Sequence, residues 1–234
     1  MQVSRDGDDG VSRCECVKNA RAERLFATAK IPQRYAHCEF ENFHIQRSSD
    51  RSIELAKIAA EKFVEEYPMS HPFGLLFMGP QGVGKTHLAV AIVKQLMKRK
   101  SVPCLFRTFP ELLKEIQNSY NPVSQASELS LLAPVLETEV LVLDELGAQN
   151  PSSWVQDTVA YVLNYRYNDN KVTILTTNYR DDDEERKEKK VGITNTLSER
   201  IGDRMRSRLY EMCKTIKMDG NDFRRTVKQA EHHF

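Results

Sequence analysis

The sequence lacks the features of a membrane protein, a secreted scaffold or a strongly basic nucleic-acid binder. No apolar run approaches the roughly 20 residues of a transmembrane helix, and the polar N-terminus has no signal-peptide stretch. The 34 basic and 33 acidic residues nearly cancel, so no global field draws the chain to nucleic acid. Five cysteines at irregular spacing in 234 residues do not suggest a disulfide framework. We therefore expect a cytoplasmic protein without membrane contact.

The cysteines also fall short of a structural zinc site. Cys14 and Cys16 supply two close thiols, whereas such a site takes four ligands. His37 and Cys38 could complete it; a site shared between subunits, or further cysteines after an upstream start codon, are the alternatives. We expect no zinc and ordinary reduced cysteines at these positions.

Apolar segments of strand length alternate with segments whose apolar residues recur at helical spacing. The segments that predict strands are 73–78, 103–108, 139–144, 172–177 and 213–218. The segments that predict helices are 13–30, 52–67, 85–99, 109–119, 126–137, 153–167 and 196–210. Strands that alternate with helices predict an α/β fold with a parallel sheet.

The strongest motif is a glycine-rich loop between the strand 73–78 and the helix 85–99. It reads Gly-Pro-Gln-Gly-Val-Gly-Lys-Thr and fits the pattern of loops that hold nucleotide phosphates. Glycines let the backbone wrap around phosphate oxygens, and the N-terminus of the next helix attracts the anion. We expect Lys85 to bridge the β- and γ-phosphates and the Thr86 hydroxyl to ligate Mg²⁺. The residues predicted to bind nucleotide are Gly79, Pro80, Gln81, Gly82, Val83, Gly84, Lys85, Thr86 and His87.

Two carboxylates follow the apolar strand 139–144. Asp144 ends this strand and is a candidate Mg²⁺ ligand. Glu145 comes next, where a carboxylate can deprotonate the water that attacks the γ-phosphate. A small-molecule kinase has less use for this second acid, because its nucleophile is a substrate oxygen. The pair therefore favours a hydrolase.

Polar residues also end the strand 172–177, which we expect beside the strand that precedes the phosphate loop. A side chain at this tip can fix the attacking water or sense the γ-phosphate. We choose Asn178 for this role and Thr177 as the second candidate.

Arginines are concentrated in the helix 196–210. Arg204 and Arg208 are one helical turn apart and share a face. Arginine suits phosphate geometry, so this pair can reach the γ-phosphate of a neighbouring subunit as an arginine finger. A surface helix with salt bridges to Glu199 and Asp203 is the alternative.

With these motifs in this order, the chain resembles AAA+ ATPases, most closely the DnaC-like replicative helicase loaders, with the IstB-type transposition ATPases as near relatives. The likeness covers about residues 31–220. It rests on residues 79–89, 143–147, 176–178 and 198–209, and on residues 31–35 and 40–43, which are similar to the segment before the ATPase domain in these families.

The resemblance implies a P-loop NTPase of AAA+ type, with a five-stranded parallel sheet flanked by helices. It also implies that Arg208, with Arg204, matches the finger position. Only sixteen residues follow Met218, so we expect no C-terminal helical lid. We assign residues 1–46 to a short N-terminal segment, partly disordered and with a candidate partner-binding helix, and residues 47–234 to the AAA+ domain.

The implied function is ATP- and Mg²⁺-dependent loading or regulation of a hexameric replicative helicase on single-stranded DNA, by a homo-oligomeric spiral or ring. The helices within 109–137 would face the DNA, where Arg107, Lys114 and Tyr120 are candidate contacts; a partner-facing helix explains these residues equally well. The alternative functions are an IstB-type regulator of a transposase on target DNA, a small-molecule kinase, and a module that binds ATP without turnover.

Overall fold

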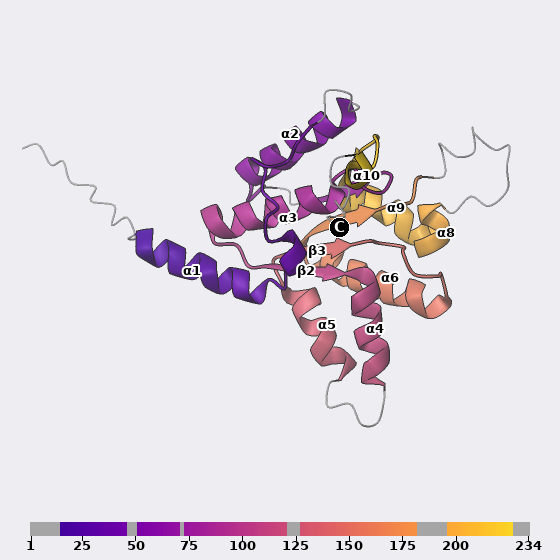
Figure 1. Ribbon diagram of the computed structural model, residues 1–234. Coiled ribbons are helices and arrows are strands. Elements are labelled where there is room, and N and C mark those ends of the chain that lie inside the picture. The colour runs from indigo at the N-terminus through magenta and orange to yellow at the C-terminus, as the bar shows by residue number, and fades with distance from the viewer. Residues whose placement is uncertain (1–14, 46–50, 71–72, 121–126, 182–195, 227–234) are drawn as a thin grey trace, which may run out of the picture.

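A five-stranded parallel sheet lies between two layers of helices in the computed structural model, which describes residues 15–45, 51–70, 73–120, 127–181 and 196–226 (Figure 1). The strands are β1 (Gly74–Met78), β2 (Cys104–Thr108), β3 (Val140–Asp144), β4 (Val172–Thr177) and β5 (Cys213–Lys217). Their order is β2-β3-β4-β1-β5, and all neighbours run parallel. The predicted parallel α/β fold is confirmed, and β4 lies beside β1 as expected.

Helices cover both faces of the sheet. They are α1 (Glu15–Thr28), α2 (Arg51–Glu66), α3 (Lys85–Gln95), α4 (Phe109–Ser119), α5 (Glu128–Glu137), α6 (Ser153–Asn168), α8 (Leu197–Ile201), α9 (Asp203–Met212) and α10 (Phe223–Thr226), with a 3₁₀ turn η1 (Gln33–Tyr35) and a π-helical turn η2 (Leu96–Lys100). None of these described helices has both the length and the apolarity that crossing a membrane requires.

Alternating residues of each strand divide the apolar core into two halves. Leu75 and Phe77 of β1 pack with α2 and α3, whereas Leu76 and Met78 pack with α4, α5, α6, α8 and α9. Both halves are apolar because both faces are covered, and this explains why the strands read as continuous apolar runs.

Two predicted helices differ from the structure. The segment 196–210 is not one helix, because Gly202 takes the left-handed φ of 84° and separates α8 from α9. The Gly202 N–H donates to Ser198 O at 2.7 Å and ends α8, and the Gly202 carbonyl then accepts from Met205 and Arg206 as α9 begins. The segment 85–99 ends as an α-helix at Gln95 and continues as the π-helical η2.

The N-terminal connector, residues 29–45, is part of the core on the α3 face. Ala29, Cys38 and Phe40 are buried there, and the Phe106 N–H of edge strand β2 donates to Ala29 O at 2.8 Å. The predicted boundary at residues 46 and 47 and the predicted disorder near the N-terminus fall on or next to residues outside the described part, and stay predictions.

The chain after β5 turns back over the phosphate loop. The Met218 N–H donates to Met78 O at 2.8 Å, and the Phe223 N–H donates to Gly82 O at 3.1 Å. As a result α10 lies beside the loop that follows β1.

A buried arginine joins helices α5 and α6 to the sheet. Arg166 of α6 is fully buried. Its guanidinium donates to the Thr173 hydroxyl at 2.9 Å and to the carbonyls of Val135, Leu136, Thr138, Glu139 and Val172 at 2.6 to 3.4 Å. Burial lowers the pKa of Arg166 to about 10, so the group stays charged at neutral pH. It therefore satisfies the carbonyls where α5 ends and where β3 and β4 begin.

Replacing Arg166 by methionine should lower the free energy of unfolding by about 3–5 kcal/mol, because several buried carbonyls lose their donor at once. Urea denaturation followed by circular dichroism measures the change. The matched control is Arg99→Met on the exposed side of η2, for which we expect a change within about 0.5 kcal/mol. Equal effects of the two substitutions would contradict this role of Arg166.

Candidate functional site

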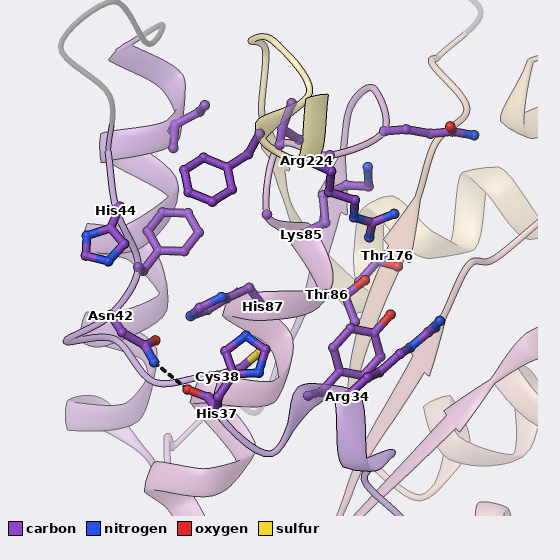
Figure 2. A pocket seen from close by; sticks show the side chains of 18 of the residues that line it. Arg34, His37, Cys38, Asn42, His44, Lys85, Thr86, His87, Thr176 and Arg224 are labelled. Atoms are coloured by element: carbon purple, nitrogen blue, oxygen red, sulfur yellow. Dashed lines mark hydrogen bonds between the residues drawn. The ribbon is translucent and has the colours of Figure 1, made fainter. Parts of the chain in front are cut away.

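A cavity of about 780 Å³ lies where β1, β3 and β4 end. Most of its lining comes from the N-terminal connector, the phosphate loop with the start of α3, the tips of β3 and β4, and the segment around α10, and α2 contributes Ile53. Figure 2 shows Arg34, Thr86, Thr176 and Arg224 from these segments around the same space. The volume suits a nucleotide-sized ligand, and the position at the carboxyl ends of parallel strands is where α/β sheets bind ligands.

The phosphate loop begins after β1 and closes at the N-terminus of α3. Gly84 has a φ of 99° and precedes the first residue of α3. A Cβ at this glycine would lie 2.5 Å from the Phe43 ring of the connector, so both the backbone conformation and the close packing require glycine. The residues from Gln81 to His87 line the cavity, and their binding of nucleotide stays a prediction. Gly79 and Pro80 take part through their carbonyls, which bind Lys85.

Lys85 is buried beneath the phosphate loop. Its Nζ donates to the carbonyls of Gly79 at 2.8 Å and Pro80 at 2.6 Å. Burial lowers the pKa of Lys85 to about 8, and the charge of Arg224 acts in the same direction, against Asp144 and Glu145. The lysine is therefore a donor held close to the place where the motif puts phosphate oxygens.

Asp144 is fully buried at the tip of β3. Its Oδ1 accepts from the Thr86 hydroxyl at 2.8 Å and from the Thr176 hydroxyl at 2.6 Å. Burial raises the pKa of Asp144 and the charge of Glu145 adds to this, while the two hydroxyl donors oppose it. The second oxygen, Oδ2, is buried and has no hydrogen-bond partner among the described residues.

This arrangement fits a divalent cation with hard ligands. A buried carboxylate oxygen without a donor is costly, and a cation satisfies it. Mg²⁺ prefers carboxylate, hydroxyl and phosphate oxygens and keeps several waters. Asp144 and Thr86, the two predicted ligands, lie next to each other as such a site requires.

Glu145 follows Asp144 in a strained conformation. Its φ is 59°, a left-handed value that costs a residue other than glycine on the order of 1 kcal/mol. The Glu145 N–H donates to the Thr176 hydroxyl at 3.0 Å, and the exposed side chain lines the cavity. A single hydroxyl of β4 therefore holds the backbone of one acid and the carboxylate of the other.

At the tip of β4 the structure separates the predicted candidates. Asn178 lines the cavity, where it can orient a water. Thr177 does not reach the ligand space, because its hydroxyl is buried and donates to Leu146 O at 2.9 Å. Thr176, to which we assigned no role from the sequence, lines the cavity and contacts both acids.

The finger candidates lie on α9, away from this cavity. Arg204 is exposed, and Arg208 donates to the Asn164 side chain, with its guanidinium 5.2 Å from the centre of the Tyr167 ring. Neither is among the residues that line the cavity. Within one chain they therefore do not contact the nucleotide site, so their role as a finger stays a prediction that requires a second copy.

The candidate DNA contacts differ in their surroundings. Arg107 forms an ion pair with Glu115 of α4, which neutralises its charge. The Tyr120 hydroxyl donates to Glu128 at 3.0 Å and accepts from Trp154 at 3.4 Å, although its ring is exposed. Lys114 is exposed. Of these three, Lys114 is the best placed to meet a phosphate backbone, and the DNA contacts stay predictions.

The cavity also contains Arg34, Tyr35 and Arg224, to which the sequence analysis gave no role at the site. Arg34 and Tyr35 belong to the connector, with the guanidinium of Arg34 4.5 Å from the centre of the Tyr35 ring. Burial raises the pKa of Tyr35, and the charge of Asp144 contributes. Arg224 of α10 lies beside Lys85 (Figure 2). The two arginines bring positive charge to the cavity from the connector and from α10.

Comparisons with known proteins identify relatives over most of the chain. A family model described as IstB-like ATP binding protein matches residues 12–231. The chain is 29% identical to the replicative helicase loader DnaC of Escherichia coli (strain K12) over 187 residues, 80% of this chain and 70% of that protein. It is 25% identical to the uncharacterized protein YqaM of Bacillus subtilis (strain 168) over 209 residues, 86% of this chain but only 61% of that protein. A crystal structure of the DnaC helicase loader superimposes with a TM-score of 0.67 at 30% identity and covers 80% of this chain and 100% of that one.

The lowered pKa of Lys85 predicts that nucleotide binding takes up a proton near pH 8. In the free protein about half of the Lys85 ammonium is deprotonated at that pH. Bound phosphates favour the charged form and raise the pKa again. Affinity should therefore fall as pH rises through 8, since binding then requires a proton from solvent.

Isothermal titration of ATP into the protein at pH 8, in two buffers with different ionisation enthalpies, measures this uptake. The control is Lys98→Met on the exposed side of η2. This variant should take up a proton on binding ATP as the wild type does. If binding at pH 8 released a proton, or caused no net proton transfer, the lowered pKa of Lys85 would be contradicted.

Proposed function

Because the chain belongs to the family of IstB-like ATP binding proteins, we propose that it is a cytoplasmic AAA+ ATPase of DNA replication. It would act as a DnaC-like loader that hydrolyses ATP to load or regulate a hexameric replicative helicase on single-stranded DNA. The relative from Escherichia coli is named a replicative helicase loader, and the crystal structure at 30% identity is that of a helicase loader. Similarity of this degree supports a replication-related ATPase; loading and the identity of the helicase belong to the proposal.

The observation that carries the ATPase is the buried Asp144 between two threonine hydroxyls, with one oxygen left without a donor. Mg²⁺ bound there would neutralise charge on the β- and γ-phosphates. Lys85 would leave the carbonyls of Gly79 and Pro80 and donate to phosphate oxygens. Arg224 would approach the same phosphates from the C-terminal side, because it lies next to Lys85 in the cavity.

Hydrolysis needs a base and an oriented water. The Glu145 carboxylate is exposed to the cavity, so it can accept the proton of a water as that water attacks the γ-phosphorus. Asn178 can hold this water through its side-chain amide. Thr176 fixes Glu145 relative to Asp144 and so sets the distance between the base and the phosphate end of the site.

We assign completion of the site to a second copy of the chain. Arg208 is held at the surface of α9 by Asn164 and Tyr167 and does not line its own cavity. In a spiral or ring it would reach the γ-phosphate of the neighbouring subunit, and Arg204 on the same face would assist. ATP would then hold subunits together, and hydrolysis would loosen them and release the partner. In such an assembly α4, with Lys114, would face the DNA.

A second candidate is an ATPase that regulates a transposase on target DNA. The description of the matching family model favours it, and the same site chemistry would serve it. The two functions differ in the partner that the ATP-bound form holds.

The predicted shared site can be tested by mixing two inactive variants. Arg208→Ala keeps the nucleotide pocket and loses the finger, while Lys85→Ala keeps the finger and loses nucleotide binding. Each alone should have an ATPase rate at least about 10³-fold below the wild type. Their mixture should regain a measurable part of the wild-type rate, since Lys85→Ala subunits supply Arg208 to intact pockets. No recovery in the mixture, or full activity of Arg208→Ala alone, would contradict a finger in trans.

The partner is tested with Glu145→Gln, which should bind ATP normally and turn over about 10²–10⁴-fold more slowly. This form should stay in the ATP-bound assembly and capture its partner from cells of the source organism. Mass spectrometry of the captured proteins should identify the replicative helicase. Recovery of a transposase instead would reject the loader and support the second candidate. Lys85→Ala, which cannot bind ATP, is the control that should capture neither.

A further inference from the structure

Three metal-ligating side chains meet in the cavity, apart from Asp144 and Thr86. His37 and Cys38 come from the connector, and His87 comes from the first turn of α3. One ligand atom from each residue lies within 4.8 Å of the other two. Figure 2 shows the three side chains close together, with Thr86 further along the cavity. Residues 50 positions apart in the chain are thereby brought to one point by the fold.

We propose that His37, Cys38 and His87 form a binding site for a divalent transition metal of the zinc class. Imidazole nitrogen and thiolate sulfur are ligands that Zn²⁺ and Co²⁺ prefer, whereas Mg²⁺ prefers oxygen. The chemistry of the ligands therefore separates this site from the one at Asp144 and Thr86. The site rests on geometry alone and does not depend on the proposed helicase or on ATP hydrolysis.

One hydrogen bond of His87 is of the kind that histidine ligands of metals make. Its Nε2 lies 2.8 Å from Glu39 O. A carbonyl oxygen can only accept, so Nε2 carries the proton and Nδ1 keeps the lone pair. Histidine ligands of metals almost always donate their other ring N–H to a carbonyl or carboxylate in this way. The bond fixes the tautomer and the ring orientation before any metal arrives.

The backbone that presents His37 and Cys38 is also fixed. The Cys38 N–H donates to Tyr35 O at 2.9 Å. The Asn42 side chain accepts from the Glu39 N–H at 3.0 Å and donates to His37 O. A turn with these bonds loses little conformational freedom on binding a metal, which favours affinity.

Lys94 attaches this turn to the same helix that carries His87. Its Nζ donates to Ala36 O at 2.7 Å and pairs with the Glu39 carboxylate at 2.5 Å. Glu39 thus contacts both Lys94 and His87 from one turn of the connector. The separation between the connector ligands and the α3 ligand is set by these contacts, not by a metal.

The remaining adjustment is small. Tetrahedral zinc, with bonds of about 2.0–2.3 Å, needs neighbouring ligand atoms about 3.5 Å apart. The three ligand atoms now lie within 4.8 Å of one another. To bind zinc, the largest of these separations must shorten by roughly 1 Å. Cys38 is 2% exposed, but His37 is exposed and can rotate toward the other two ligands. Three protein ligands leave a fourth position, and because all three residues line the cavity, a water or a ligand in the cavity can take it.

This set differs from the one weighed in the sequence, Cys14 and Cys16 completed by His37 and Cys38, from which we expected no zinc. Cys14 and the side chain of Cys16 lie outside the described part of the structure, and the third ligand is instead His87, which directly follows the phosphate-loop motif. No spacing rule joins His87 to residue 38. The proposal therefore predicts a site that needs neither Cys14 nor Cys16.

Cobalt titration of the full chain without nucleotide tests the site, because Co²⁺ reports its own ligands by absorption. The wild type should bind one equivalent with intense d–d bands of tetrahedral geometry and a thiolate-to-cobalt charge-transfer band, and Zn²⁺ should displace it. The variant C38S should lose the charge-transfer band. H37Q, at an exposed position, should weaken binding by about tenfold or more while the protein stays folded by circular dichroism. The double variant C14S/C16S is the matched control and should behave as the wild type.

Several results would overturn the proposal. Weak bands without thiolate character would mean adventitious binding by surface histidines. Loss of the charge-transfer band in C14S/C16S with its retention in C38S would place the thiolate elsewhere. If C38S fails to fold, unchanged cobalt affinity of H37Q would by itself reject the site.

Discussion

The Thr176 hydroxyl, which donates to the buried carboxylate of Asp144 and accepts from the backbone of Glu145, is the contact on which the site depends. A carboxylate at the centre of an apolar sheet is stable only where donors and a cation can satisfy it. Thr86 supplies the second donor from the start of α3. The tips of β3 and β4 and the end of the phosphate loop must therefore converge on one point, and the parallel strand order brings them there.

The charges around this point are arranged for an anion that arrives with a cation. Lys85, Arg34 and Arg224 approach from three different segments, while Asp144 and Glu145 are adjacent at the tip of β3. Burial weakens Lys85 as a cation in the free protein and raises the pKa of Asp144. Burial therefore disfavours the charged form of each group, and bound counter-charges would offset this cost. Phosphates with a divalent cation supply both counter-charges at once.

Features of the fold and the site that depend on residues close in sequence could be predicted, and those that depend on contacts between distant segments could not. The phosphate loop is a local motif, and the strands are continuous apolar runs, so both were predictable. Alternation within β4 could also have identified Thr176. Ile174 packs on the α3 face and Leu175 on the other, which puts Thr176 and Asn178 on the side of the phosphate loop and Thr177 away from it. Gly202 likewise marked the break between α8 and α9. The resemblance marked residues 31–35 without placing them at the site, and no pattern indicated Arg224. The positions of Arg34, Tyr35 and Arg224 depend on how the segments before and after the sheet fold back over it.

The connector and the segment around α10 extend the nucleotide site beyond the phosphate loop and the strand tips. The connector is anchored to β2 through Ala29 and to α3 through His87 and Lys94, and it leads directly from α1 into Arg34 and Tyr35 of the cavity. On the other side, Phe223 bonds Gly82 and places Arg224 beside Lys85. A ligand that contacts both ends stabilises the conformations in which both are docked, and by the same linkage a partner that holds α1 changes affinity for that ligand. Since the connector joins α1 to the cavity through a few ordered residues, any partner that bound α1 would be coupled to the occupancy of the site without contacting it.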